Sequence, residues 1–445
     1  MSDQPRRRRP RSPYATPSGR LLVATTALLA AATIVGLVAL WPHEEGARGS
    51  AASGAAASGG VAAGDDAAAS GDAAASDDAA AGGDAAAAGG DMAAGGGAST
   101  AMGGPTVAAT VTRVFTVDCG GPQPQDCVRV EARLGDGRRT AMTLGPVGTI
   151  KAPAPGAHVR LQPIAAPPTG DVARPHVDAY AYAGIDRRRP LALIALVFAA
   201  LVVLLARARG LLALAGLGLS IALVTTFVLP AILAGKPAAP VALTGSLAVM
   251  FVTVLLTYGV TPPSLAACLG IAASLILATL AGAVAVHAAQ LDGRSGELGL
   301  YLAAQGGISL PAVVLAGLVI GALGVLADMG VTQASTVMAL RRANPELSAS
   351  ALFTGAFGVG RDHLIAATHT LVLAYLGASL PLLLTLTASG VATTDVLNAQ
   401  EVAEPIVATL IGALALLVSV PLTTALCAAI TRQMPPESLP GHHHH

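Results

Sequence analysis

From Pro190 onward the chain is almost continuously apolar, and polar and ionisable side chains crowd there into one segment, residues 321–377. An ionisable group within or beside a membrane span is costly to keep there, so it is by default a hypothesis of function. The alternatives are a solvated helix end for Asp328 and a mutual salt bridge between Arg361 and Asp362. The segment predicts a site for a small solute, built from Asp328, Arg361, Asp362, Thr368, His369, Thr370 and Tyr375.

Within this segment, Gly355–Asp362 (GAFGVGRD) is rich in glycine and precedes a predicted helix. The backbone N–H groups of such a turn and the helix N-terminus can hold an anion, and Arg361 adds a positive charge. The stretch has no GK[ST] and follows no strand, so nucleotide binding is not expected. It favours an anionic solute, for which inorganic phosphate is a candidate.

Two polar rows follow on the same predicted helix. Asp362 and His369 are seven positions apart and share one face, and Arg361, Thr368 and Tyr375 repeat that spacing on the neighbouring stripe. The rows indicate either a water-filled cavity or a polar contact between helices. His369 could titrate and couple to proton movement, or be a satisfied structural group.

The elements that must position these groups are helices over Pro311–Ala327 and Leu364–Leu386. Asp328 then falls at the end of the first helix. Between the two, Thr332–Leu340 is predicted to be a separate amphipathic helix that lies on the membrane surface or re-enters the membrane. Ser348 is the predicted N-cap of a further short helix.

The composition indicates a membrane protein. Of 445 residues, 53% are hydrophobic and 12% are charged, whereas a soluble domain has about 25% charged residues. The net charge of +0 argues against nucleic acid as a partner. The expected fold is an α-helical polytopic membrane protein with about eight transmembrane helices and a small extracytoplasmic all-β domain. The predicted helices are Leu21–Trp41, Leu191–Ala206, Leu211–Leu233, Val241–Tyr258, Ser264–His287, Pro311–Ala327, Leu364–Leu386 and Pro405–Ile430.

Composition also predicts the domain boundaries. The first apolar run is interpreted as a retained anchor rather than a cleaved signal peptide, because it is longer than a usual signal core and has no clear cleavage site. The terminal histidines, His442–His445, are not counted as metal ligands. The predicted segments are a disordered basic cytoplasmic N-terminus (1–19), a transmembrane anchor (20–41), a disordered Ala/Gly/Ser/Asp linker (42–105), an extracytoplasmic β domain (106–186), a multi-helix transmembrane domain (187–431) and a cytoplasmic tail (432–445).

The β domain is predicted from turn chemistry and alternation. Cys127–Leu134 and Arg138–Leu144 flank Gly135-Asp136-Gly137, which is a hairpin pattern. A disulfide between Cys119 and Cys127 fits an extracytoplasmic location. No zinc site, other metal site or cofactor motif is expected, because the further ligands are missing nearby.

Short-loop arginines predict the orientation. A cytoplasmic N-terminus places Arg341, Arg342 and Arg432 inside, with the C-terminus, and the β domain outside. One conflict remains, because Arg187–Arg189 would abut a helix on the outer side. Abundant small residues let helices approach closely and would permit a homo-oligomer.

Several runs resemble the YibE/F-like family of bacterial multipass membrane proteins: GALGVLADMGVTQASTVMAL, NPELS, GVGRD, THTLVLAYLGASLPLLL and SVPLTTALCA. The resemblance covers roughly Asp186–Thr431. It implies an integral inner-membrane protein with an extracytoplasmic domain, and a suspected role in transport.

The leading functional hypothesis is a secondary transporter or exporter of a small solute, such as an anion, within the lipid bilayer. The alternative is an envelope sensor, receptor or scaffold whose β domain binds a partner. An enzyme is not expected, because the chain has no GxSxG, no HExxH and no paired aspartates on facing helices.

Overall fold

The computed structural model describes residues 17–42, 105–119, 125–149, 151–164, 179–295, 299, 302–303 and 307–433. The predicted N-terminus, linker and C-terminal tail lie almost wholly outside these residues. The chain divides into two compact units: Asp65–Leu201, here called the β unit, and Met1–Gly64 with Val202–His445, here called the helical unit. Each is described by itself.

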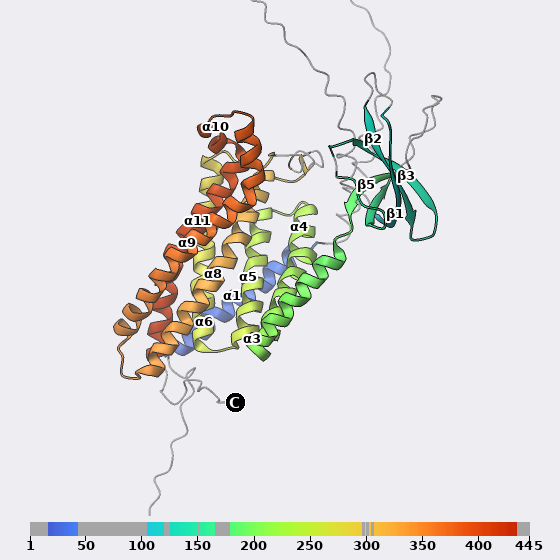
Figure 1. Cartoon of the computed structure of the whole chain (residues 1–445). Coiled ribbons are helices and arrows are strands. Elements are labelled where there is room, and N and C mark those ends of the chain that lie inside the picture. The colour runs from blue at the N-terminus through green and yellow to red at the C-terminus, as the bar shows by residue number, and fades with distance from the viewer. Residues whose placement is uncertain are drawn as a thin grey trace, which may run out of the picture. The chain divides into compact units, whose positions relative to one another are not determined.

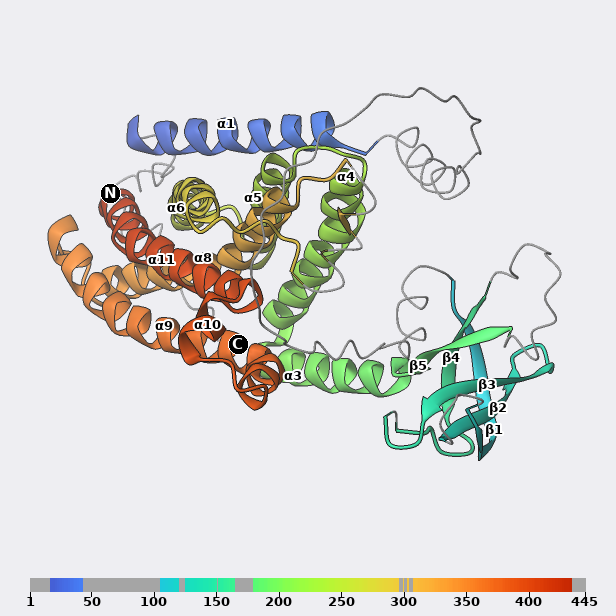
Figure 2. The same cartoon turned by 90° about the horizontal axis from the view of Figure 1, so that it is seen from above.

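The helical unit consists of long apolar helices (Figures 1 and 2). Among the described residues, seven helical runs are long and apolar enough to cross a membrane. The expectation of a mostly helical, apolar fold is confirmed. The elements are α1 (Pro17–Leu40), α3 (Arg188–Leu223, which begins in the β unit), the π-helix η3 (Val224–Val228), α4 (Leu229–Leu233), α5 (Ala238–Tyr258), α6 (Pro262–Ala288), α8 (Leu310–Ala343), α9 (Ala349–Ala388), α10 (Thr393–Asn398) and α11 (Gln400–Arg432).

The predicted separation of Leu191–Ala206 from Leu211–Leu233 is confirmed. α3 consists of two helices that meet at a kink at Arg207, and the second continues through η3 and α4 to Leu233. The backbone of Arg207 is non-helical there, with φ 50° and ψ −129°. A Cβ added to Gly210 would lie 2.6 Å from the carbonyl oxygen of Val202, although a straight helix separates residues eight apart by about 12 Å. The chain therefore reverses at Arg207.

The predicted end of a helix at Ala327 is wrong. α8 continues through Asp328 to Ala343, so Thr332–Leu340 is the last part of α8 and not a separate surface helix. A polar side chain does not end a helix in an apolar layer, because the helix satisfies its own backbone hydrogen bonds there. Asp328 consequently lies within a long helix.

The predicted glycine-rich turn at Gly355–Asp362 is also wrong, as is a helix start at Leu364. α9 runs without a break from Ala349, with Ser348 as its N-cap, and the Ser348 hydroxyl accepts a hydrogen bond from the Ala351 N–H at 3.1 Å. Each glycine inside a helix reduces its stability by about 1 kcal/mol. An unsatisfied backbone group in an apolar layer would cost more free energy than that. The backbone N–H groups of this stretch therefore lie within a continuous helix.

α8 packs against four long helices of the unit, α5, α6, α9 and α11 (Figure 2). Glycines allow these close contacts. A Cβ on Gly330 of α8 would lie 2.5 Å from Cγ1 of Ile271 on α6, and Gly270 of α6 abuts Thr423 of α11. Small residues at helix crossings are a general means of packing in membranes.

The β unit contains β1 (Val107–Asp118), β2 (Asp126–Leu134), β3 (Arg139–Pro146), β4 (His158–Pro163) and β5 (Tyr180–Ile185). They form one antiparallel sheet in the order β3-β2-β1-β4-β5. β3 also contacts β5, so the sheet curls toward a small barrel around Val111, Val130, Met142 and Leu161. The predicted hairpin is confirmed as β2 and β3.

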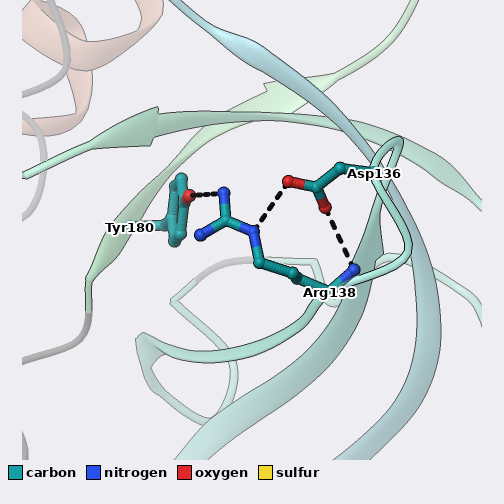
Figure 3. A network of polar contacts seen from close by, with 3 residues as sticks. All are labelled: Asp136, Arg138 and Tyr180. Atoms are coloured by element: carbon teal, nitrogen blue, oxygen red, sulfur yellow. Dashed lines mark hydrogen bonds and ion pairs between the residues drawn. The ribbon is translucent and has the colours of Figure 1, made fainter.

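Polar contacts at the hairpin turn tie it to β5 (Figure 3). Arg138 donates from Nε to Oδ2 of Asp136 at 2.7 Å and from its backbone N–H to Oδ1 at 3.0 Å. Its Nη2 also donates to the Tyr180 hydroxyl at 3.4 Å. The structure has a disulfide between Cys119 and Cys127, which joins the end of β1 to the start of β2.

Candidate functional site

Asp328 lies near the middle of α8 and faces a histidine of α9. Its Oδ2 is 3.5 Å from Nε2 of His363, and the two side chains are 67% and 39% exposed. α8 has 34 residues, about 51 Å at 1.5 Å per residue, against roughly 30 Å of apolar bilayer core. A residue near the middle of such a helix falls within the apolar layer when the helix spans it. A carboxylate and an imidazole in contact there could exchange a proton.

Asp328 also lines a groove of about 580 Å³ between α3, α5 and α8. Three of the hydroxyl groups in the groove, on Ser220, Thr225 and Thr253, donate to carbonyl groups of the preceding turn. Ser246 is different, because it is 2% exposed and its hydroxyl has no partner among the described residues. Asp328, Ser246 and the hydroxyl-bearing residues Thr257, Tyr258 and Thr332 are the other polar residues that line the groove.

The π-helix η3 forms part of the same groove. Val224, Thr225 and Val228 belong to η3 and line the groove wall. Opposite them, Gly245 of α5 lies so close that an added Cβ would be 2.5 Å from Cγ2 of Val228. π-helical turns inside longer helices are frequent at functional sites. The π-helical turn η3 and the carboxylate of Asp328 thus line the same groove.

The polar rows predicted on α9 lie on its exposed side. Arg361 and Asp362 have side chains 68% and 79% exposed, and Nε of Arg361 is 3.9 Å from Oδ1 of Asp362. His369 and Thr370 are exposed as well, and the Thr370 hydroxyl donates to the carbonyl of Ala367 at 2.8 Å. Among the described residues these groups do not assemble around one cavity. They form a polar strip on the surface of the helical unit.

Two other predicted residues turn toward neighbouring structure. Thr368 is half-buried and donates to the carbonyl of Leu364 at 2.9 Å. Tyr375 is half-buried, and a Cβ on Gly321 of α8 would lie 3.3 Å from its hydroxyl oxygen. Two residues of α9 therefore approach α8. Tyr375 meets it at Gly321 and His363 meets it at Asp328, two turns of α8 further along.

A buried polar contact lies behind this surface. Gln333 of α8 is fully buried, and its Oε1 accepts a hydrogen bond from the Thr424 hydroxyl of α11 at 2.7 Å. The Nε2 of Gln333 has no partner among the described residues. A Cβ on Gly360 of α9 would be 2.5 Å from that nitrogen. Gln333 thus joins α8, α9 and α11.

Sequence reasoning missed His363, Gln333 and Ser246. His363 directly follows Asp362 and is itself titratable, so its residue type was an available signal. Its contact with Asp328 could not be predicted from residue spacing along the sequence, because the two residues belong to different helices. Gln333 and Ser246 are single polar residues in apolar helices, and only burial separates them from surface residues.

The described residues contain no group of three or more His, Cys, Asp and Glu side chains that could hold a metal ion. Long apolar helices around a groove with a carboxylate, in one chain with a small antiparallel β unit, indicate a helical membrane protein. The family model of the YibE/F-like proteins matches residues 194–433. The chain therefore belongs to the YibE/F-like family, as its resemblance indicated. Comparison with curated proteins and with solved structures gives no match.

Proposed function

We propose that this protein is a secondary transporter that couples the movement of a small solute to protons. The groove between α3, α5 and α8 is the solute path, and Asp328 with His363 is the proton-binding pair. The observation that carries the proposal is the carboxylate of Asp328, which lines the groove and contacts the imidazole at 3.5 Å.

The energetic argument concerns the position of Asp328. An aspartate at the centre of a membrane helix costs about 2.5–3.5 kcal/mol on insertion scales. That cost is retained only where the group has a function or a partner, and a single imidazole with 39% exposure is an incomplete partner. A carboxylate that alternately binds and releases a proton provides such a function.

The solute class is proposed more broadly than the sequence indicated. The ground for an anion was a glycine-rich turn, and that stretch is helical. Arg361 lies beside Asp362, which opposes its positive charge. Inorganic phosphate is therefore one probe among others, and metal cations such as K⁺ and Mg²⁺ are equally suitable probes.

The experiment uses the full chain in proteoliposomes that contain a pH-sensitive dye. Gradients of inorganic phosphate, K⁺ and Mg²⁺ are imposed one at a time, and the internal pH is followed. In the wild type we expect one of these gradients to drive proton movement. Asp328→Asn should slow it by about tenfold or more, because no carboxylate remains at that depth to carry the proton. His363→Gln should slow it less.

Asp395→Asn is the matched control, because Asp395 is an exposed carboxylate of α10 outside the groove. It should leave the rate unchanged. Equal rates in the wild type and Asp328→Asn, or no proton movement with any probe, would contradict the proposal. The scaffold hypothesis, in which the β unit binds a partner and the helices only anchor it, would then be preferred.

The proposed location is a bacterial inner membrane, with both termini in the cytoplasm and the β unit outside. Its support is the distribution of short-loop arginines, in particular Arg341 and Arg342 near the end of α8. A homo-oligomer is part of the proposal, because the polar strip on α9 offers surface for a second copy.

A further inference from the structure

A cavity of about 390 Å³ lies in the β unit where the chain passes from β5 into α3. Its basic lining residues are Arg133 at the end of β2 and Arg188 and Arg189 in the first turn of α3. His158 at the start of β4 and the carboxylate of Asp186 complete the polar lining. Three guanidinium groups against one carboxylate make the pocket electropositive.

Backbone hydrogen bonds hold the pocket in shape. The Asp186 N–H donates to the carbonyl of His158 at 2.9 Å, and the Gly135 N–H donates to the carbonyl of Ala108 at 3.3 Å. The imidazole Nδ1 of His158 is 3.3 Å from the hydroxyl of Thr110. The ends of four strands are thus connected around the cavity, so hydrogen bonds fix the backbone that carries its arginines.

The carboxylate does not neutralise the arginines. Oδ1 of Asp186 accepts the backbone N–H of Arg188 at 3.0 Å and so caps the helix. Within the described part of the chain, the side chains of Arg133, Arg188 and Arg189 have no ion-pair partner. Arg139 is the direct cross-strand neighbour of Arg133, and like charges opposite each other destabilise a sheet. A bound anion would relieve this repulsion.

The position of the pocket along the chain identifies the kind of anion. Arg188 and Arg189 begin a helix whose next residues expose large apolar side chains, with Leu191 60% and Ile194 66% exposed. Such a surface needs lipid, so the arginines lie at the level of the headgroups. We infer that this pocket binds the phosphate group of an anionic phospholipid. The inference does not depend on the transport function.

This inference also accounts for the conflict with the positive-inside rule. Arg187–Arg189 adjoin a helix on the side where the β unit is proposed to be, and arginines are usually scarce there. A specific contact with the phosphate of a headgroup gives a reason to keep them. Guanidinium groups suit phosphate because they donate in pairs.

The test uses the purified full chain in a neutral detergent and native mass spectrometry. Phosphatidylglycerol, phosphatidylcholine and inorganic phosphate are each titrated. We expect the wild type to bind phosphatidylglycerol at least about tenfold more tightly than phosphatidylcholine. Arg133→Gln and Arg189→Gln should each weaken binding of phosphatidylglycerol about fivefold. Arg133→Lys should retain most of the preference.

Lys151→Gln is the control, because it removes one positive charge from an exposed residue outside the pocket. It should not change lipid binding. Equal binding of the two lipids, or equal losses in Lys151→Gln and Arg133→Gln, would overturn the inference. Displacement of phosphatidylglycerol by low concentrations of inorganic phosphate would indicate a site for free oxyanions and would overturn the lipid assignment.

Discussion

Asp136 and Asp328 are carboxylates in opposite situations. Asp136 is in water at a hairpin turn, and the hydrogen bonds from the Arg138 side chain and backbone lower the pKa of Asp136 below its ordinary value. Asp328 lies within an apolar helix, and its carboxylate contacts the imidazole of His363. The carboxylate of Asp136 holds the hairpin turn, and water weakens its electrostatic interaction with Arg138. The carboxylate of Asp328 is the one expected to act in transport.

The turn makes a pH-dependent contribution to the β unit. Because the folded pKa of Asp136 is lowered, its stabilisation is present above the unfolded pKa of about 3.9 and is lost as the pH falls through the folded value. We expect Asp136→Asn to reduce hydrogen-exchange protection of residues 126–146 at pH 7. The difference from the wild type should shrink as the pH falls below the unfolded pKa of about 3.9 and vanish only below the lowered pKa of the folded state.

The measurement is hydrogen-exchange mass spectrometry of the full chain, with variants compared at the same pH. Asp126→Asn is the matched control, because Asp126 is an exposed carboxylate at the start of β2 away from the turn. A difference between Asp136→Asn and wild type that persists unchanged to low pH would show that the Asp136 charge is not the cause.

At the scale of elements, the contact of α8 with α9 positions the site. Gly360 of α9 lies over the amide of Gln333, and Tyr375 lies over Gly321 of α8. These close approaches set the spacing at which His363 meets Asp328. The glycines that the sequence favoured as an anion-binding turn therefore serve helix packing, at least at Gly360.

A substitution at Gly360 tests this packing. Gly360→Ala would place a Cβ 2.5 Å from Nε2 of the fully buried Gln333, so we expect a loss of about 1–3 kcal/mol of stability. Gly358→Ala is the control, because its Cβ would meet nothing within 4 Å. The control should be neutral or gain up to about 1 kcal/mol from helix propensity.

Thermal unfolding of the purified protein, followed by circular dichroism, compares the two variants. The expected order of midpoints is Gly358→Ala at or above the wild type, and Gly360→Ala below it. Equal midpoints for both variants would mean that α9 does not approach α8 as closely as the structure has it.

At the scale of the whole molecule, the chain combines a disulfide-bearing β unit with an apolar helical unit. Disulfides persist in oxidising compartments, whereas Arg341 and Arg342 in the last turn of α8 favour the cytoplasmic side. Cys268 and Cys427, the other cysteines of the chain, are buried in the helical unit. The two units are therefore expected to present their loops to different compartments.

Cysteine labelling in intact cells tests this orientation. Lys151→Cys, in the β unit, should react with a membrane-impermeant maleimide added outside. Asn344→Cys, between α8 and α9, should react only after the membrane is permeabilised. Both positions are exposed, and the buried native cysteines should give little background. The reverse labelling pattern would invert the proposed orientation.

The sequence alone was sufficient for the class of protein and for its local β structure. An apolar run long enough to cross the bilayer predicts a membrane helix. The prediction needs only the length and composition of that run, whichever helices it later packs against. The β2–β3 hairpin followed from Gly135–Gly137, because turn chemistry is a local property. Ser348 was recognisable as an N-cap for the same reason.

Only the tertiary structure decided which helices continue and which polar groups meet. Asp328 and Gly355–Gly360 look locally like interruptions, but α8 and α9 pass through them. An apolar layer penalises every open backbone group, and side chains of α8 fill the space at Gly355 and Gly360. The contacts of Asp328 with His363 and of Gln333 with Thr424 join different helices. No periodicity within a single helix specifies such pairs, because they depend on how helices pack.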